Sequence, residues 1–376
     1  MENNLDFNFQ VLLDAIGLLQ GATLGILLII LNRRQNRSTF FLGIYLLFFS
    51  LELGVFISMD PAISARYPEL FLLPFNFSWL LFPLFFIYTQ QVSVLSREKT
   101  KYWLLYPGIA MLMFQTFIFW LPFETKQVVV QSRWYSFICW ELGTYYSWMI
   151  GIWNLRILYR HRIEVQNTYS YVTAKELQWA RVFLIFLLAN SVISHILIYG
   201  FTQNFYHKIF FSVMDLIAIY WVSYFGILQR NVRSLLNSNW NSDVSQIKPM
   251  EQKQAGIITQ KKLEELMMKI DNHMALTKSF INPDLTIVDL AKGLEVHPKL
   301  LSTTINTYNK QNFNSYVNQF RIIKAEKLLK NKNMKNLSIE GIGKEVGFHS
   351  KSAFYSAFKK ETGTTPTKFL ELSEST

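Results

Sequence analysis

The stretch IGKEVGFHSKSAFYSAFKKETGTTPTKF occupies positions 342–369 of the 376-residue chain. Its apolar residues recur at helical spacing on both sides of Gly347, and Ser350 is a typical residue for the start of a second helix. Gly363 and Pro366 then end the pattern. The stretch predicts a short helix, a tight turn and a second helix, which is the helix-turn-helix arrangement.

The same pattern occurs a second time, earlier in the chain. TIVDLAKGLEV, from Thr286, aligns with SIEGIGKEVGF, from Ser338, so that apolar positions in the two first helices are 52 residues apart. Thr286 and Asp289 have the spacing of a capping box, and Pro298 suits the first position of the following helix. The second helices have apolar anchors 53 residues apart, which are Leu301 and Ile305, then Phe354 and Phe358. We therefore predict two helix-turn-helix units in tandem.

A long helix is predicted between the two units, over residues 312–331, with one apolar side formed by Val317, Phe320, Ile323 and Leu328. Such a connector would hold the two second helices at a fixed separation. In helix-turn-helix proteins the second helix enters the major groove of double-stranded DNA. The spacing therefore predicts that one chain spans successive major grooves.

The charge of the chain agrees with an anionic partner. Residues 278–372 contain fifteen Lys or Arg and eight Asp or Glu, and the whole chain has a net charge of +11. The single cysteine, Cys139, excludes an intrachain disulfide and a zinc cage of cysteines. The chain also lacks phosphate-binding, dinucleotide-binding, zinc-protease and nucleophile-elbow motifs. We therefore predict no enzyme activity, no cofactor and no metal site.

Residues 283–370 resemble the carboxyl-terminal DNA-binding domain of the AraC/XylS family of bacterial regulators. The matching pieces are Leu290-Ala291, Asn312-Phe313, Arg321-Ile322 with Ala325, Gly347-Phe348, Phe354, Phe358-Lys359-Lys360, Gly363, Pro366 and Phe369. Gly343 stands where the family has alanine, and Lys368-Phe369-Leu370 replaces an aromatic-arginine ending. The resemblance implies a transcription regulator that binds specific DNA.

The resemblance also implies which side chains face the DNA. The base-reading positions are Lys299, Ser302, Thr303 and Asn306 in the first unit, and Lys351, Ser352, Tyr355 and Ser356 in the second. The phosphate contacts are Lys310, Lys324, Lys359 and Lys360. These residue types suit the roles, because Lys donates to guanine and Asn pairs with adenine, whereas phosphate contacts position a protein without reading bases.

Seven long apolar runs precede this domain, at residues 11–31, 40–58, 70–91, 102–121, 136–159, 179–199 and 208–228. A membrane span needs about 20 mostly apolar residues. The runs are too long and too many for the core of a soluble protein. The sequence therefore predicts an all-α protein, in which a seven-helix transmembrane bundle precedes the tandem helix-turn-helix domain. This layout is similar to that of membrane-bound regulators of the AraC/XylS family.

Positive charges between the runs predict the orientation. One side has thirteen, which are Arg33, Arg34, Arg37, Arg97, Lys99, Lys101, Arg156, Arg160, Arg162, Lys175, Arg181, Arg230 and Arg233. The other side has four, which are Arg66, Lys126, Arg133 and Lys208. The side richer in Lys and Arg is cytoplasmic. We therefore predict a multi-pass protein of the inner (cytoplasmic) membrane, with its amino terminus outside and its DNA-binding domain in the cytoplasm.

Six polar residues lie within the runs, all in the outer half of the bilayer by this orientation: Glu52, Asn76, Gln115, Glu141, His195 and Asp215. Polar groups at this depth face the bundle interior or a wet cavity. Three interpretations stay open. The residues fix the packing through interhelical hydrogen bonds, they line an outward-facing pocket for a small cationic, amine-bearing or metal ligand, or they form a proton or ion pathway.

The predicted domain order is a sensor at 1–230, a polar linker at 231–258, a coupling helix at 259–280 and the DNA-binding domain at 281–372. The coupling helix has an apolar stripe formed by Leu263, Leu266, Met267 and Ile270. This stripe packs either on the domain that follows or on its twin in a homodimer, and the first packing is favoured.

The predicted function is a membrane-anchored, one-component transcription regulator, switched by a ligand that the transmembrane bundle senses. A sensor and a DNA reader on one chain need no phosphorelay. The alternative is a membrane transporter or enzyme with an attached DNA-binding regulatory domain. A third interpretation makes the helical domain a protein-interaction module.

Overall fold

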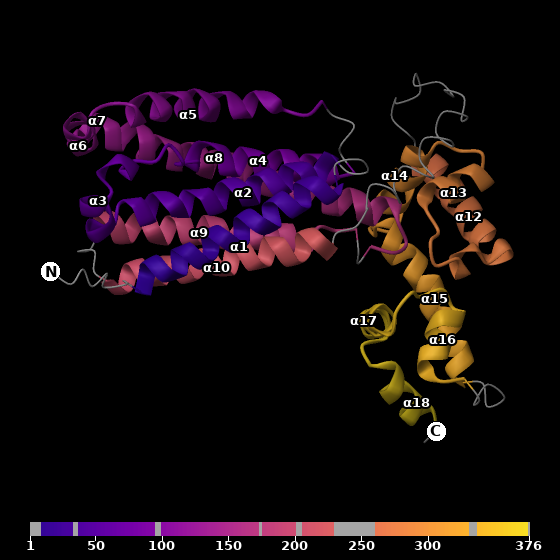
Figure 1. Ribbon diagram of the computed structural model, residues 1–376. Helices are drawn as coiled ribbons and strands as arrows, with labels where there is room; N and C mark the ends of the chain where they lie inside the picture. Colours follow the sequence, from indigo (N-terminus) through magenta and orange to yellow (C-terminus); the bar gives the residue numbers. More distant parts are fainter. Residues whose placement is uncertain are drawn as a thin grey trace. The chain divides into compact units, whose positions relative to one another are not determined.

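The computed structural model describes residues 9–32, 37–94, 99–172, 175–200, 205–228, 260–330 and 337–374. Within these ranges the chain is helical apart from turns and one isolated β-bridge, which confirms the all-α fold class (Figure 1). The contacts divide the chain into two units. Unit 1 comprises Met1–Arg160 and Leu177–Arg233, and unit 2 comprises His161–Glu176 and Ser234–Thr376. The predicted linker at 231–258 lies outside the described residues.

Unit 1 is a bundle of long helices with short helices at one end. Its helices are α1 (Phe9–Asn32), α2 (Arg37–Ser58), α3 (Pro61–Arg66), α4 (Ser78–Val92), α5 (Tyr106–Phe119), α6 (Phe123–Gln131), α7 (Arg133–Ser136), α8 (Leu142–Thr168), α9 (Gln178–Gly200) and α10 (Phe205–Leu228). A π-helical turn, Phe137–Glu141, joins α7 to α8. The short helices α3, α6 and α7 lie together at the end of the bundle opposite the carboxyl end of α1 (Figure 1).

Five helical segments of the described residues are long and apolar enough to cross a membrane. They are Phe9–Ile30, Thr39–Ser58, Tyr102–Phe119, Gln178–Ile198 and His207–Leu228, and they correspond to five of the seven predicted spans. The other two predicted spans fall on α4 and α8. Helix α4 has 15 residues, so it is about 22 Å long, shorter than a hydrocarbon core of about 30 Å. Helix α8 has many Tyr, Trp and Asn residues in place of aliphatic ones. The count of seven spans therefore stays a prediction.

The short helix α4 lies in the core of unit 1. Its residues Phe85, Phe86, Ile87 and Tyr88 are at most 1% exposed. A helix that is apolar on all sides is buried by its neighbours, because no face of it favours water. Phe85 contacts the rings of Tyr45 on α2 and Phe183 on α9, so α4 connects distant parts of the bundle.

Helices α1 and α2 approach each other closely at two glycines. A Cβ atom on Gly25 would lie 2.8 Å from the backbone nitrogen of Leu47 and 2.9 Å from the carbonyl oxygen of Gly43. Gly25 belongs to the series Gly17, Gly21 and Gly25 on α1, at four-residue spacing. This spacing places small residues on one helix face and lets two backbones come together, as in membrane helix pairs.

Unit 2 contains seven described helices. They are α12 (Gln260–Thr277), α13 (Ile287–Gly293), α14 (Pro298–Tyr308), α15 (Phe313–Lys330), α16 (Ile339–Glu345), α17 (Lys351–Thr362) and α18 (Pro366–Glu374). The pairs α13–α14 and α16–α17 are the two predicted helix-turn-helix units, and α15 runs between them (Figure 1).

Each helix-turn-helix unit has its own core, and α15 contributes to both. Phe313, Tyr316 and Val317 belong to the first core, and Ile322 with Ala325 belongs to the second. The predicted apolar side of this helix was partly wrong. Ile323 is 47% exposed, and its neighbour Ile322 is 2% exposed. The reason is that α15 buries different faces at its two ends, so no single stripe runs along it.

The predicted coupling helix is α12, and it packs within its own chain. Met267, Ile270 and Met274 are buried in the first core, together with Leu301 and Ile305 of α14. Three residues of the predicted stripe, Leu266, Met267 and Ile270, thus pack within the chain.

Each of the two turns contains one residue with positive φ, and the residue types differ. Gly347, before α17, has a φ of +100°, and Glu295, before α14, has a φ of +55°. Glycine adopts positive φ without a Cβ clash, whereas this conformation is uncommon for other residues. A Cβ on Gly347 would lie 2.6 Å from the carbonyl oxygen of Ile281, so the second turn requires glycine for space as well.

Candidate nucleic-acid interface

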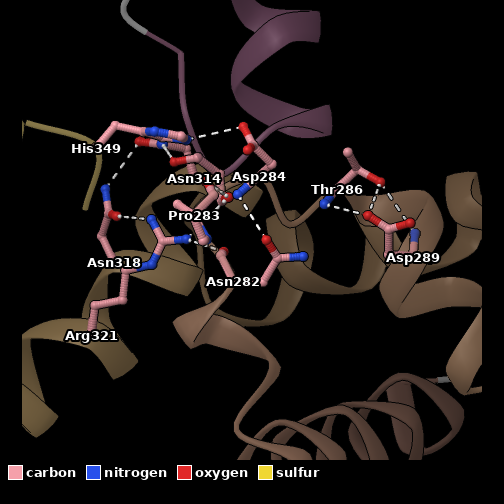
Figure 2. Close-up of polar contacts among 10 residues, drawn as sticks. Asn282, Pro283, Asp284, Thr286, Asp289, Asn314, Asn318, Arg321 and His349 are labelled. Carbon is pink, nitrogen blue, oxygen red and sulfur yellow. Dashed lines mark hydrogen bonds and ion pairs between the residues drawn. The ribbon is translucent and has the colours of Figure 1, made fainter. Parts of the chain in front are cut away.

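Local capping positions the four helices of the two units. The capping box forms, because Asp289 N donates to Thr286 Oγ1 (3.2 Å) and Thr286 N donates to Asp289 Oδ2 (2.9 Å) (Figure 2). Ser350 Oγ accepts a hydrogen bond from Ala353 N at 3.2 Å, which confirms the predicted cap of α17. His297 caps α14 by accepting from a backbone N–H, with proline at the first helical position. Side chains on α14 and α17 thus project from defined helix starts.

The predicted base-reading residues of α14 lie on one face. Lys299, Ser302, Thr303 and Asn306 follow helical spacing, and Leu301 and Ile305 on the other side are fully buried. Lys299 and Thr303 are exposed, whereas Ser302 and Asn306 are half-buried.

The predicted base-reading residues of α17 are more exposed. Lys351, Ser352 and Ser356 are exposed, and Tyr355 is half-buried. The Lys351 ammonium lies 5.6 Å from the centre of the Tyr355 ring, and the Tyr355 hydroxyl is 3.2 Å from Thr367 Oγ1 of α18. The contact with α18 fixes the ring, so Tyr355 presents a rigid aromatic surface beside the Lys351 charge.

Three of the four predicted phosphate contacts are exposed lysines. Lys310, Lys359 and Lys360 are exposed, and Lys324 on α15 is half-buried. Lys360 Nζ donates to Ser315 Oγ on α15 at 3.0 Å, which directs its ammonium toward the connector helix. Such exposed positive groups can contact phosphates without reading sequence.

Sequence reasoning missed the role of Arg321, which belongs to the interior of unit 2. Its side chain is 1% exposed and sits in a cage of oxygen acceptors (Figure 2). Nε donates to the Phe280 carbonyl at 2.7 Å, and Nη2 donates to the Asn282 carbonyl at 2.8 Å and to Ser170 Oγ at 3.2 Å. Burial lowers the pKa of Arg321 to about 10, against a partial opposing effect of the Asp284 carboxylate. The guanidinium therefore stays charged at neutral pH and holds α15 to two other segments.

Arg321 also touches the second helix-turn-helix unit. Its guanidinium lies 5.4 Å from the centre of the Phe348 ring, next to the turn before α17. The adjacent His349 pairs with Asp284 at 3.0 Å. These contacts join the second helix-turn-helix unit to the segment that precedes the first one. The two helix-turn-helix units are therefore held together by more than α15.

The six polar residues of the predicted spans lie in two groups. Asn76 and Gln115 bond each other, since Gln115 Nε2 donates to the Asn76 carbonyl at 3.0 Å and Asn76 N donates to Gln115 Oε1 at 3.2 Å. Glu52 accepts a hydrogen bond from the backbone N–H of Phe77, the residue after Asn76. Glu52 also lies close enough to Asp215 for the charges of the two carboxyl groups to interact. Four of the six are thus linked around one place.

The remaining two residues lie near the start of α8, with Glu141 directly before it and His195 on α9. The His195 ring packs edge-on against Tyr145 (5.8 Å between ring centres) and Trp148 (5.3 Å). Glu141 is half-buried and precedes Tyr145 by one helical turn.

Sequence reasoning overlooked one member of the first group. Asp14 on α1 is 2% exposed, and its charge interacts with that of Asp215. The signal was present, because Asp14 is the only ionisable residue in the first apolar run.

Comparison with known proteins agrees with the geometry of unit 2. Residues 290–371 match a protein-family model described as a helix-turn-helix domain. The match supports the resemblance of unit 2 to AraC-type DNA-binding domains. The match begins within α13 and ends within α18, so it includes both helix-turn-helix units and supports a DNA-binding transcription regulator. No curated protein and no solved structure matches the chain.

Proposed function

We propose that this protein is a membrane-anchored transcription regulator that reads specific double-stranded DNA through α14 and α17. The observation that carries the proposal is the pair of helix-turn-helix units on one connecting helix, each with polar, basic side chains on the outer face of its second helix. The proposed base-reading residues are Lys299, Ser302, Thr303, Asn306, Lys351, Ser352, Tyr355 and Ser356. The proposed phosphate contacts are Lys310, Lys324, Lys359 and Lys360.

The test uses the full-length protein in detergent and duplexes enriched by it from genomic fragments. We expect affinity to fall steeply between roughly 50 and 200 mM salt, because each neutralised phosphate releases counterions. Lys360→Ala should weaken binding to all sequences and lower the salt slope by about 1. Lys299→Ala and Lys351→Ala should instead relax preference at one base position, by about 1–3 kcal/mol each.

Two outcomes would reject these assignments. Binding that does not respond to salt would contradict the interface as a whole. An equal loss on every sequence for all three variants would leave the interface in place but reject Lys299 and Lys351 as base readers.

The proposal includes an inner-membrane location with the amino terminus outside and the DNA-binding domain in the cytoplasm. The five apolar helices and the excess of Lys and Arg between alternate runs support it. A protease-sensitive tag at the amino terminus should be cleaved from outside intact cells, and the same tag after Thr376 should be protected. Cleavage at Thr376 would overturn both the topology and the access to DNA.

We also propose that the bundle senses a small cationic ligand through the group that contains Glu52 and Asp215. Asp215 lies near both Glu52 and Asp14, and three carboxyl groups in one region support an attraction for positive charge. A ligand switches output only if it binds two bundle states with different affinities. Asp215→Asn keeps the shape and removes the charge. It should leave protein level and basal DNA binding intact and abolish the response to stimulus, whereas a purely structural role predicts a lower protein level.

A further inference from the structure

The carboxyl end of α8 and the residues that follow it are part of unit 2. Helix α8 begins in unit 1, but from His161 onward the chain contacts the DNA-binding domain, and it returns to unit 1 at Leu177. His161 Nε2 donates to the Lys175 carbonyl at 2.7 Å, and Gln166 Nε2 donates to Glu176 Oε1 at 2.6 Å. The segment between His161 and Glu176, called the loop below, therefore begins with the last turns of α8, has its ends joined by hydrogen bonds and leads into α9.

The middle of this loop is bonded to the segment that precedes α13. Tyr169 forms an antiparallel bridge with Thr286, and Ser170 N donates to the Leu285 carbonyl at 3.1 Å. Ser170 Oγ lies 3.2 Å from Arg321 Nη2 inside unit 2. Tyr169 is 7% exposed and Ser170 is 3% exposed, so the loop is built into the domain.

The loop also reaches the proposed DNA-facing side of both helix-turn-helix units. Asn306 Nδ2, on α14, donates to Asn167 Oδ1 at 3.3 Å. The Tyr171 ring lies 4.3 Å, centre to centre, from the ring of His349, which directly precedes the cap of α17. A surface pocket of about 440 Å³ lies between the end of α8 and the end of α14, lined by Ile163, Gln166, Asn167, Asn306, Lys310, Gln311 and Asn312. Two proposed DNA contacts, Asn306 and Lys310, therefore lie beside the loop.

We propose that residues 166–171 are an autoinhibitory clamp, which occupies part of the reading face of α14 and must leave before the first unit can enter the major groove. The proposal rests on the DNA-binding function proposed above. The clamp and the DNA compete for one surface, so the domain binds either of them but not both.

Competition follows from the size of the groove. The major groove is about 12 Å wide and admits one α-helix, whose diameter with side chains is about 10–12 Å. The last turn of α8 lies against α14 at Asn306, so the two segments do not fit the groove together. Asn306 pairs with adenine through both its amide nitrogen and its oxygen. One of the two N–H donors of this amide is already bonded to Asn167.

The attachment of the loop suggests how the clamp is released. Both of its ends are continuous with helices of unit 1, so a ligand that shifts α8 against α9 pulls on residues 161 and 176. A shift that favours the undocked loop raises the population that can bind DNA.

The decisive experiment locks the clamp with a disulfide in the full-length protein. Tyr169 and Thr286 are a cross-strand pair, and such pairs have Cα atoms about 4.5–5.5 Å apart, within the range for disulfides. Tyr169→Cys and Thr286→Cys are combined with Cys139→Ala, which removes the buried free thiol. Binding of a random-sequence 30-bp duplex pool is measured by fluorescence anisotropy, before and after reduction.

We expect the oxidised protein to bind the pool roughly 5–150-fold more weakly than the reduced protein, the usual range for coupled sites. The reduced sample carries the same substitutions and is the matched control. Asn167→Ala combined with Tyr171→Ala removes the contacts of the loop with both helix-turn-helix units. Neither substitution changes a proposed DNA contact. This release variant should bind the pool more tightly than the wild type by a factor within the same range.

The outcomes separate the clamp from the DNA-binding function. Equal affinity of the oxidised and reduced proteins overturns the clamp and leaves the DNA-binding function standing. Binding by the release variant alone supports the clamp, because it shows a docked loop that blocks DNA in the parent. Absence of binding by every protein, the release variant included, overturns the DNA-binding function and the clamp with it.

Discussion

Removal of the buried guanidinium of Arg321 should loosen unit 2. Arg321→Met keeps a long side chain of similar shape but deletes every donor. The Phe280 and Asn282 carbonyls and the Ser170 hydroxyl then lose the partner that now lies 2.7–3.2 Å away. The bonds to the Phe280 carbonyl and the Ser170 hydroxyl are buried, and the bond to the Asn282 carbonyl is partly buried.

The magnitude follows from the two buried acceptors, the Phe280 carbonyl and the Ser170 hydroxyl. A buried polar group left without a hydrogen bond costs about 1–3 kcal/mol, so two give about 2–6 kcal/mol. The variant also avoids the desolvation of a buried charge, which offsets part of this loss. We therefore expect the free energy of opening in unit 2 to fall by about 2–4 kcal/mol, and a fall of about 1.4 kcal/mol is tenfold in the opening constant.

Hydrogen exchange measured by mass spectrometry suits this test, because it reports each unit separately in the full-length protein. Peptides that contain residues 279–285 and 168–172 should lose protection by roughly 30- to 1000-fold. Lys327→Met is the control, since it removes one positive charge from the exposed side of the same helix. If Arg321→Met exchanges no faster than Lys327→Met at these peptides, the reasoning about buried acceptors is wrong.

Three further predictions concern backbone space and protonation. Gly347→Ala should destabilise unit 2 by at least about 1 kcal/mol in denaturant unfolding, because its φ is positive and a Cβ would lie 2.6 Å from a carbonyl oxygen. Gly341→Ala, at a helical position where a Cβ would make only ordinary contacts at 3.4 Å or more, should stabilise by about 0.5–1 kcal/mol, and equal effects of the two would contradict this account. Burial lowers the pKa of His161 below 6.5 in the folded state. As the pH falls, the imidazole therefore binds its proton in the unfolded state before it does so in the folded state. Stability of the 161–176 loop, followed by hydrogen exchange, should therefore be full above about pH 6.5 and decrease below it, and His161→Gln should remove that decrease. Gly25→Ala should lower the Tm of unit 1 in detergent, because its Cβ would meet the backbone of α2, whereas Gly54→Ala, whose nearest neighbour is at 4.0 Å, should not.

Local features of this protein could be predicted from its sequence. The tandem helix-turn-helix units follow from apolar spacing within segments of about ten residues, and the caps at Thr286 and Ser350 involve partners three positions away. Such contacts depend on helix geometry alone. The same holds for the long apolar helices, whose length and composition are properties of one segment.

Two predictions from sequence patterns were wrong for a common reason. They are the apolar side of α15 and the length of the helix at α4. Periodicity reports which side of a helix is buried only when one partner covers it along its whole length. Helix α15 serves two cores, so Ile322 is buried and Ile323 is exposed. The chain before Ser78 is apolar yet not helical, so the apolar run that begins at residue 70 overestimates the length of α4.

Only the tertiary structure brought Ser170 to Arg321, because these residues are 151 positions apart and neither carries a local signal of the other. A buried arginine is stable where acceptors from several segments converge, and that convergence arises from folding rather than from any one stretch of sequence. The contact of Asn167 with Asn306 has the same origin, across 139 positions. Sequence thus determined which helices have the pattern of a DNA-binding domain. Long-range packing decided that a loop between α8 and α9 is part of that domain. The physical reason is that the free energy of such packing depends on groups that only the fold places together.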